Sequence, residues 1–364
     1  MNSLVIILLT IFVLPRFEFM GTSIGFVLMF GYALIEYILN QIYSKYPKKN
    51  FTKNDLLYPL FILAFIYNIP FFYNSFEFSS IKKFLFPLFL WFYLVGKDGK
   101  YLKQLFSEKN IIFVICVIGG ILIYDFIQMF SLNEGIKKIY SFANPNYTGF
   151  LLLSIQAFYL TVNKNKQSKF LLVITTVLIF LTFSKTAYVL QIITIMWILK
   201  KQKIVLMLAI FIPVLILILT TGKLLDNFYL QIIDFLSHDL QAGINSREKI
   251  INIALSIFQN NLFFGCGYGN IVPESVKLGG KAYETHNIIL TSLAECGLFG
   301  FLSLMICSVV ILLKIKVIYK INSNVILIFL IYFLYALTHA GGESLIFVPL
   351  IFKTLSTNLY EGYD

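Results

Sequence analysis

Apolar runs of about 15–25 residues, separated by short lysine-rich links, recur along the chain and limit what it can fold into. Each run is long enough to cross a bilayer as a helix. Hydrophobic residues make up 59% of the sequence and charged residues only 13%, whereas soluble domains carry roughly 25% charged residues. The pattern predicts an all-α, polytopic membrane protein with about 12 transmembrane helices.

The positions of these runs define the expected spans. We expect them at about residues 3–19, 21–43, 55–73, 81–96, 111–130, 147–162, 169–183, 186–199, 204–220, 286–313, 325–339 and 344–356. Residues 1–364 are therefore predicted to form a single integral membrane domain. Its one large loop, residues 221–285, is predicted to contain amphipathic helices.

The lysines predict how the spans are oriented. If the link at 44–54 is cytoplasmic, counting spans places the other lysine-rich links on the same side, namely those at 97–109, 164–169, 200–203 and 314–320. We therefore expect a multi-pass protein of the inner or plasma membrane with both termini in the cytoplasm. The loop 221–285 would face the periplasm or the cell exterior. Orientation accounts for the net charge of +11, so we expect no nucleic-acid partner.

The four cysteines do not form a metal-binding motif. Cys116, Cys266, Cys296 and Cys307 are scattered, without a CxxC pair or the spacing of a zinc site. Three of the four fall in predicted spans, which argues against a disulfide framework. We expect no metal and no cofactor.

The longest polar interruption, from Asn245 to Gly300, is the expected place for chemistry. Asn245 and Glu248 have the spacing of a capping box at the start of a helix. An apolar stripe follows at helical spacing, at Ile250, Ile251, Ala254, Ile257 and Phe258. Arg247 shares the face of this stripe, which we take as the membrane-facing side. Its guanidinium would contact either a lipid phosphate or a substrate phosphate.

A glycine-rich segment, Gly265–Gly269, follows this predicted helix. It does not follow a strand of a βαβ unit and lacks the GK[ST] of a P-loop, so neither nucleotide-binding motif applies. Two interpretations remain. The segment is either a plain turn after the helix or a bend that lets the backbone approach another group closely.

His286 opens the next span, at the predicted outer membrane surface. The positive end of a helix dipole keeps an imidazole neutral, which suits a general base. The alternative is a histidine that only bonds local backbone at the start of the span. Glu295 lies further into the same span, where a carboxylate rarely lacks a partner or a role. It would either orient an inner polar network or brace the packing.

These motifs, in this order, resemble the C-terminal signature of the O-antigen ligase and repeat-unit polymerase family. The signature elements are Arg247, a helix, the segment 261–269, the pair His286-Asn287 and the segment 295–300. Residues 143–146 and 183–186 are similar to the other outer-face motifs of that family. The resemblance covers a predicted catalytic region at residues 140–300.

The resemblance implies a membrane glycosyltransferase that uses a polyprenyl diphosphate-linked oligosaccharide on the outer face, without a metal or a nucleotide sugar. It implies that Arg247 and Lys185 contact the diphosphate and that His286 activates the acceptor hydroxyl. Lys281 is a further candidate for diphosphate binding, and four residues are expected to support the site: Glu295, Asn287, Asn146 and Gly267.

The sequence departs from the commoner family pattern at two places. Lys185 stands where arginine is frequent, and lysine lacks the two-pronged guanidinium. Leu262 and Phe263 stand where many members carry proline. The first of these departures places the role of Lys185 in question.

The sequence leaves three alternative functions to be compared. The first is a polymerase that joins lipid-linked repeat units into O-antigen, capsular or exopolysaccharide. The second is a ligase that moves finished glycan onto lipid A core or another acceptor. The third, from a different class, is a flippase or other transporter, which would tend to show inverted repeats and midplane polar groups. Expected partners are the lipid-linked substrate and membrane lipid, with a chain-length regulator and a flippase as further candidates.

Overall fold

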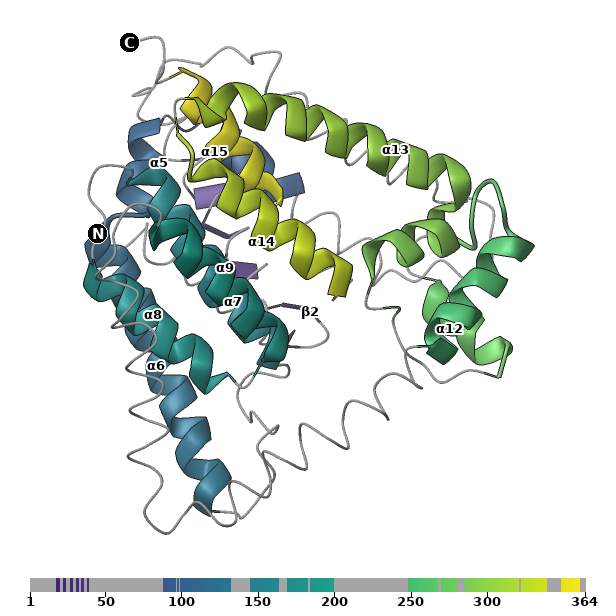
Figure 1. The fold of residues 1–364 in the computed structure, drawn as a ribbon, viewed down its shortest axis with the longest axis horizontal. Coiled ribbons are helices and arrows are strands. Elements are labelled where there is room, and N and C mark those ends of the chain that lie inside the picture. Colours follow the sequence, from purple (N-terminus) through teal and green to yellow (C-terminus); the bar gives the residue numbers. More distant parts are fainter. Residues whose placement is uncertain are drawn as a thin grey trace. The chain divides into compact units, whose positions relative to one another are not determined.

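The structure is a computed structural model of the chain, and it describes helices from both halves of the sequence (Figure 1). The described residues are 18–19, 22–23, 27–28, 31–32, 34–35, 38, 88–95, 97, 99–131, 145–163, 169–182, 184–199, 248–267, 270–279, 285, 287–320, 322–338 and 348–360.

Almost all of these residues are helical. The strands among them are the two-residue β1 (Glu18–Phe19) and β2 (Thr22–Ser23), which pair antiparallel. The all-α prediction is therefore confirmed for this part of the chain. The predicted span 21–43 is wrong at its start, because Thr22 and Ser23 are extended and pair with β1.

The chain divides into two compact units by contact. The first contains residues 1–16 and 103–245, and the second contains residues 17–102 and 246–364. The short helix α5 (Gly99–Leu105) includes the boundary between them. A single integral domain over residues 1–364 stays a prediction.

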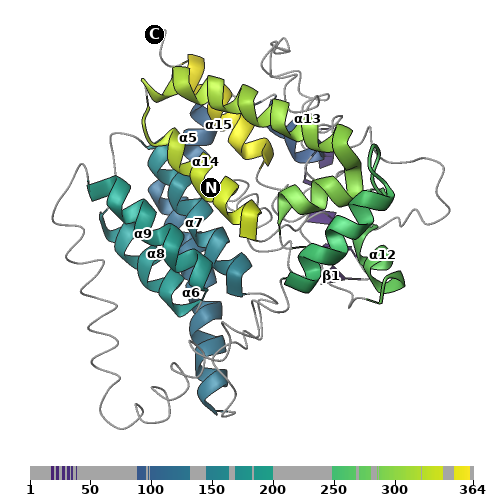
Figure 2. The ribbon, with the colours of Figure 1, turned by 45° about the vertical axis from the view of Figure 1, so that its right-hand side comes forward.

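Besides the end of α5, the described part of the first unit contains the helices α6 (Glu108–Ser131), α7 (Pro145–Val162), α8 (Lys169–Leu181) and α9 (Lys185–Leu199). The helix α7 packs against each of the other three, as Figures 1 and 2 also show. It is buried continuously from Tyr147 to Thr161. A helix that is apolar on all sides is stable only when it is covered on all sides, and α7 has that position.

A close contact holds the start of α7 against the turn between α8 and α9. A Cβ added at Gly149 would collide with the side chain of Ala187 and press on Thr182 and Ser184. Small residues allow helix backbones to approach closely in membrane proteins. The contact therefore fixes the N-terminal ends of α7 and α9 beside each other.

The second unit contains two unlabelled helices, at residues 88–95 and 248–260, together with α12 (Ile271–Lys277), α13 (Ile288–Tyr319), α14 (Val325–Thr338) and α15 (Val348–Tyr360). The long helix α13 contacts α12, α14 and α15. One core cluster joins it to the helix at 88–95 and to α15, through Trp91, Val95, Cys296, Leu304, Val348 and Phe352. Lys353 of α15 is buried and donates a hydrogen bond to the Val95 carbonyl at 3.2 Å.

The helices agree with the expected spans to different degrees. The predicted spans 111–130, 147–162, 169–183, 186–199, 325–339 and 344–356 coincide with α6, α7, α8, α9, α14 and α15, with boundary shifts of a few residues. Among the described residues, the segment Glu108–Gln128 of α6 is long and apolar enough to cross a membrane by itself. The helices α8, α9 and α14 are apolar but shorter. The total of about 12 spans stays a prediction. Most of the spans expected before residue 88 lie outside the described residues, as does the span expected at 204–220.

The predicted span 286–313 is wrong in one respect, because α13 is broken. The backbone leaves the helical region at Gly297, where φ is 64° and ψ is −163°. We call the portion of α13 before Gly297 its first part and the portion after it its second part. The segments Ile288–Leu302 and Leu304–Ile318 make an angle of 63° and are long and apolar enough to form one broken span together. Figures 1 and 2 show this bend. A single apolar run in the sequence therefore contains two helical directions.

Gly149→Ala is expected to destabilise the protein, because the new methyl group must displace Ala187. Overpacking of this kind costs about 1–3 kcal/mol. The control is Gly120→Ala in α6, where a Cβ meets nothing within 4 Å and better helix propensity adds about 0.5–1 kcal/mol. Thermal unfolding of both variants in detergent micelles measures the difference. Equal midpoints would contradict the close contact at Gly149.

Candidate functional site

The predicted site residues fall into two groups. Asn146, Gly267, Asn287 and Glu295 are described with their surroundings. Lys185 is described only as the first residue of α9. The remaining three, Arg247, Lys281 and His286, lie outside the described residues, so their assigned roles stay predictions.

In the first unit, the family-like motifs at 143–146 and 183–186 are joined by a hydrogen bond between Ser184 and Asn146. Ser184 donates its hydroxyl to the Asn146 Oδ1 at 2.6 Å. The same hydroxyl accepts a bond from the Ala187 N–H at 3.2 Å, so Ser184 caps the start of α9. Asn146 lies in the first turn of α7. The sequence singled out Asn146 and Lys185 but not Ser184, the residue that joins their two helices.

In the second unit, the glycine-rich segment packs onto the break in α13. Two N–H groups of the segment donate to carbonyls at the end of the first part of α13, from Cys266 to Ala294 and from Gly267 to Glu295, each at 2.9 Å. Two N–H groups at the start of the second part donate back. Leu298 bonds the Leu262 carbonyl at 2.9 Å, and Phe299 bonds the Phe263 carbonyl at 3.2 Å.

These four bonds give partners to backbone N–H and C=O groups that a helix break would otherwise leave without a hydrogen bond. Helix ends have N–H and C=O groups without intrahelical partners. A buried backbone group without a partner costs about 1–3 kcal/mol. The segment 262–267 therefore replaces, for the two parts of α13, the bonds that an uninterrupted helix would supply.

The approach is close enough to require glycine on both sides. A Cβ on Gly265 would collide with the backbone of Glu295 and Cys296, and one on Gly297 would collide with the backbone of Phe263 and Gly265. Gly265 and Gly297 both have positive φ, at 72° and 64°, and Gly267 has a φ of 95°. The interpretation of Gly265–Gly269 as a bend for close backbone approach is confirmed at Gly265, and the group approached is α13 itself.

Glu295 connects this junction to α12. Its side chain is buried, and its Oε1 accepts a hydrogen bond from the Ile271 N–H at 3.3 Å. The first N–H groups of a helix lack intrahelical partners, and a carboxylate is favoured beside them. Asn270 adds a bond from its Nδ2 to the Cys266 carbonyl at 3.2 Å. Of the two roles expected for Glu295, these contacts support bracing of the loop.

Asn287 fixes the start of α13. Its Oδ1 accepts bonds from the Ile289 N–H at 2.9 Å and the Leu290 N–H at 3.2 Å, which makes it the N-cap. Its Nδ2 donates to the Leu337 carbonyl near the end of α14, at 3.1 Å. The residue after His286 is therefore bound both to its own helix and to a neighbouring one.

The apolar stripe of the helix at 248–260 faces protein. Ala254 and Ile257 are buried in a cluster with Cys266, Ile271 and Ala294. The expectation that this stripe faces the membrane is therefore wrong at its centre, because α12 and the first part of α13 cover it. Burial raises the pKa of the Cys266 thiol in this cluster, and the nearby carboxylates of Glu295 and Glu274 add to the effect. The thiol therefore stays protonated and unreactive.

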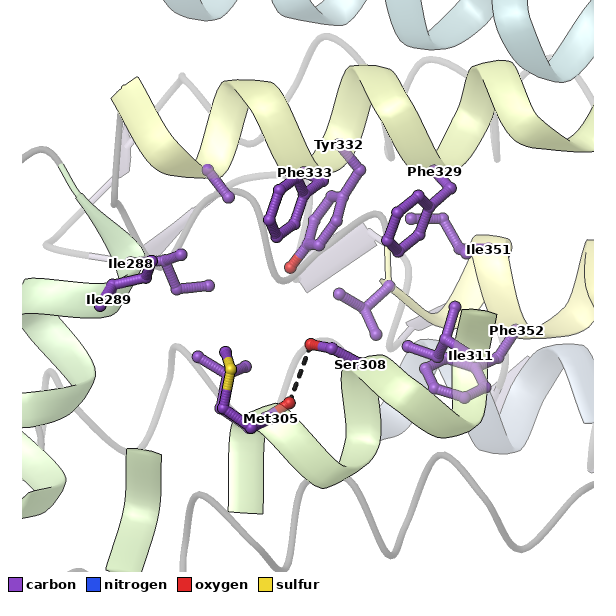
Figure 3. A pocket seen from close by; sticks show the side chains of 13 residues that line it. Ile288, Ile289, Met305, Ser308, Ile311, Phe329, Tyr332, Phe333, Ile351 and Phe352 are labelled. Carbon is purple, nitrogen blue, oxygen red and sulfur yellow. Dashed lines mark hydrogen bonds between the residues drawn. The ribbon is translucent and has the colours of Figure 1, made fainter. Parts of the chain in front are cut away.

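An apolar cavity of about 50 Å³ lies between α13, α14 and α15. Figure 3 shows aromatic side chains of α14, among them Tyr332 and Phe333, facing Met305 and Ile311 of α13 across it. The hydroxyl of Ser308 is bonded to the Leu304 carbonyl at 2.8 Å. No charged side chain lines the cavity, so it is unsuited to a diphosphate. No cluster of three or more His, Cys, Asp or Glu side chains capable of holding a metal occurs among the described residues.

A known protein family matches the part of the chain that contains most of these elements. Residues 170–305 match the family model of O-antigen ligase. The resemblance expected from the sequence is thereby confirmed over this region, which includes both Lys185 and His286. Proteins of this family are integral to the membrane and act on lipid-linked glycans. A search of curated proteins finds no match to the chain.

Gly297→Ala is expected to lower the stability of the second unit more than Gly279→Ala. Both glycines have positive φ, at 64° and 76°, and left-handed backbone costs an L-residue about 1–2 kcal/mol. At Gly279 a Cβ meets nothing within 4 Å, whereas at Gly297 it collides with backbone. The difference in thermal midpoint therefore isolates the collision. Equal losses would show that the segment does not pack onto the break as described.

Asn287→Ala is expected to cost about 0.5–2 kcal/mol through loss of the cap, with a further loss of about 0.5–1.5 kcal/mol for the bond to Leu337. Asn287→Ser keeps a capping oxygen but does not reach α14. Thermal unfolding should rank the serine variant between the wild type and the alanine variant. If serine were as damaging as alanine, the cap would not be the stabilising contact.

Proposed function

We propose that this chain is a membrane glycosyltransferase that transfers oligosaccharide from polyprenyl diphosphate on the outer face of the inner or plasma membrane, without a metal. Its leading form is a polymerase of repeat units for O-antigen, capsular or exopolysaccharide. The observation that carries the proposal is the match of residues 170–305 to the O-antigen ligase family. That region includes all four residues proposed for catalysis or diphosphate binding: Lys185, Arg247, Lys281 and His286.

The proposed cations stabilise the leaving group. Diphosphate gains charge as the glycosidic bond to it breaks, and fixed positive groups in a site drier than water lower that barrier. Arg247 is the first candidate, with Lys185 and Lys281 as further ones. A charge-assisted hydrogen bond contributes about 1.5–3 kcal/mol. Support for a substrate role of Arg247 comes from the helix that follows it, whose stripe is packed against protein at Ala254 and Ile257.

His286 is the proposed general base for the acceptor hydroxyl. Its support is its neighbour Asn287, which caps α13 and bonds α14. A ring beside the start of a helix is held neutral by the dipole, and a neutral imidazole accepts a proton. General base catalysis of this kind contributes about 10²–10⁴-fold.

The proposal includes a topology and partners. About 12 spans would cross the membrane, with both termini in the cytoplasm and the loop 221–285 on the opposite side. The basic links between spans support this orientation. A flippase would deliver the lipid-linked substrate, and a chain-length regulator would act on the growing polymer.

The test is an assay with purified protein in vesicles that contain lipid-linked repeat units. Arg247→Ala and His286→Ala are expected to abolish chain lengthening, because each removes one half of the proposed chemistry. The matched control is Lys277→Ala in the same loop. The Lys277 side chain is exposed and bonded to Glu274, so its loss should leave the products unchanged. Long polymer at wild-type level from either site variant would refute the assignment.

The second candidate is a ligase, which the name of the matched family favours. The accumulated product separates the two in cells that lack the protein. Loss of a polymerase leaves single repeats on the carrier lipid, whereas loss of a ligase leaves finished polymer there. Movement of the lipid across vesicles without a new glycosidic bond would instead favour a transporter.

A further inference from the structure

Three apolar side chains beside the break in α13 are exposed. Phe263 and Phe264 are 54% and 57% exposed, and Phe299 at the start of the second part of α13 is 46% exposed. The rings of Phe263 and Phe264 lie 6.0 Å and 5.4 Å from the ring of Phe299, measured between centroids. Leu262 beside them is exposed as well. We call these four residues the aromatic tip.

The aromatic tip is continuous with an exposed apolar face of α13. Beyond Phe299, exposed apolar side chains follow on one helical face, at Leu302, Ile306, Val309, Leu313 and Val317. The bend of 63° between Leu302 and Leu304 falls within this stretch, and the straight portion from Ile306 to Val317 is about 16 Å long. The hydrocarbon core of a bilayer is about 30 Å thick. The straight portion of the face therefore covers about half of that thickness, and the aromatic tip with Leu302 extends the apolar surface on the other side of the bend.

The two ends of this face carry different residue types, as the two ends of a membrane span do. Lys316 and Lys320 lie exposed at the far end, and lysines favour the cytoplasmic side. The aromatic tip stands at the opposite end, where the chain comes from the outer loop. Three of its side chains come from the loop segment that is bonded to the break in α13, so the tip cannot move independently of α13.

We infer that the aromatic tip inserts into the outer leaflet and contacts lipid acyl chains. An inserted tip would hold the segment 261–267 at the membrane surface. It would thereby also fix the depth of the break in α13 relative to that surface. The charged and polar residues on the exposed side of the helix at 248–260, Glu248, Lys249, Asn252 and Gln259, would remain in water or among headgroups. The inference takes the outer leaflet from the proposed topology, but the lipid contact itself stands without the proposed glycan transfer.

The control for this inference is on the same loop. Val276 and Leu278, at the end of α12, are also exposed apolar side chains. They lie outside the continuous face of α13 and beside the ion pair of Lys277 with Glu274. A probe at Leu278 therefore reports how an exposed apolar position of this loop behaves when it is in water.

The experiment uses full-length Phe264→Trp and Leu278→Trp proteins in phosphatidylcholine vesicles with brominated acyl chains. Bromine quenches tryptophan only on contact, and the unsubstituted protein supplies the emission of the two native tryptophans. Apolar faces of interfacial segments sit about 5–10 Å into the boundary of headgroups and acyl chains. We expect brominated lipid to remove at least half of the added emission at position 264 and little at 278.

Two results would overturn the inference. Quenching at position 264 by aqueous iodide, as strong as at 278, would place the tip in water. Protection from both iodide and brominated lipid would show that protein covers the tip, as in an interface between two copies. Both variants replace exposed residues, so retention of the wild-type thermal midpoint verifies that each is folded.

Discussion

The reciprocal backbone hydrogen bonds between the segment 262–267 and the break in α13 are the contact on which the second unit depends. A break in an apolar helix exposes carbonyl and N–H groups where water is scarce, and membrane structures tolerate such a break only when protein satisfies those groups. Here the segment supplies two donors and two acceptors. Glycine at 265 and 297 makes the approach possible, because any Cβ at either position would collide with backbone.

This junction carries the other features of the candidate site. Glu295 reaches from the end of the first part of α13 to the start of α12, and Asn287 ties the start of α13 to α14. The aromatic tip extends from the same segment. The loop that the sequence marks as the place for chemistry is therefore fixed to α13 by its backbone. In the first unit, Ser184 connects the start of α9 to the start of α7 by one side-chain hydrogen bond to Asn146.

The sequence predicted the helices well and their interruptions poorly. The long apolar runs produced α6, α7 and α14 at the expected places, because hydropathy and helix length follow from composition. The break at Gly297 was missed, since it lies inside the predicted span 286–313 and hydropathy contains no information about φ. Its signal was present in Gly297 itself, as glycine is frequent where backbone leaves the helical region. The stripe at Ala254 and Ile257 was found by periodicity, but periodicity could not tell a protein partner from a lipid one.

The candidate site was predictable in part. Asn146, Gly267, Asn287 and Glu295 each take part in a contact that orders the local backbone, and the family match covers the last three. Asn146 required Ser184 as partner, 38 positions away in sequence, and no local pattern reveals such a pair. The roles of Arg247, Lys185, Lys281 and His286 rest on the resemblance and on general chemistry.

The measurement that tests the central contact most directly is amide hydrogen exchange of the full-length protein in lipid nanodiscs. If the segment and the helix break form one cooperative unit, the amides of Cys266, Gly267, Leu298 and Phe299 should be protected together and should exchange at a common rate. Exchange of Cys266 and Gly267 at the rate of an open loop, with Leu298 and Phe299 still protected, would contradict the account.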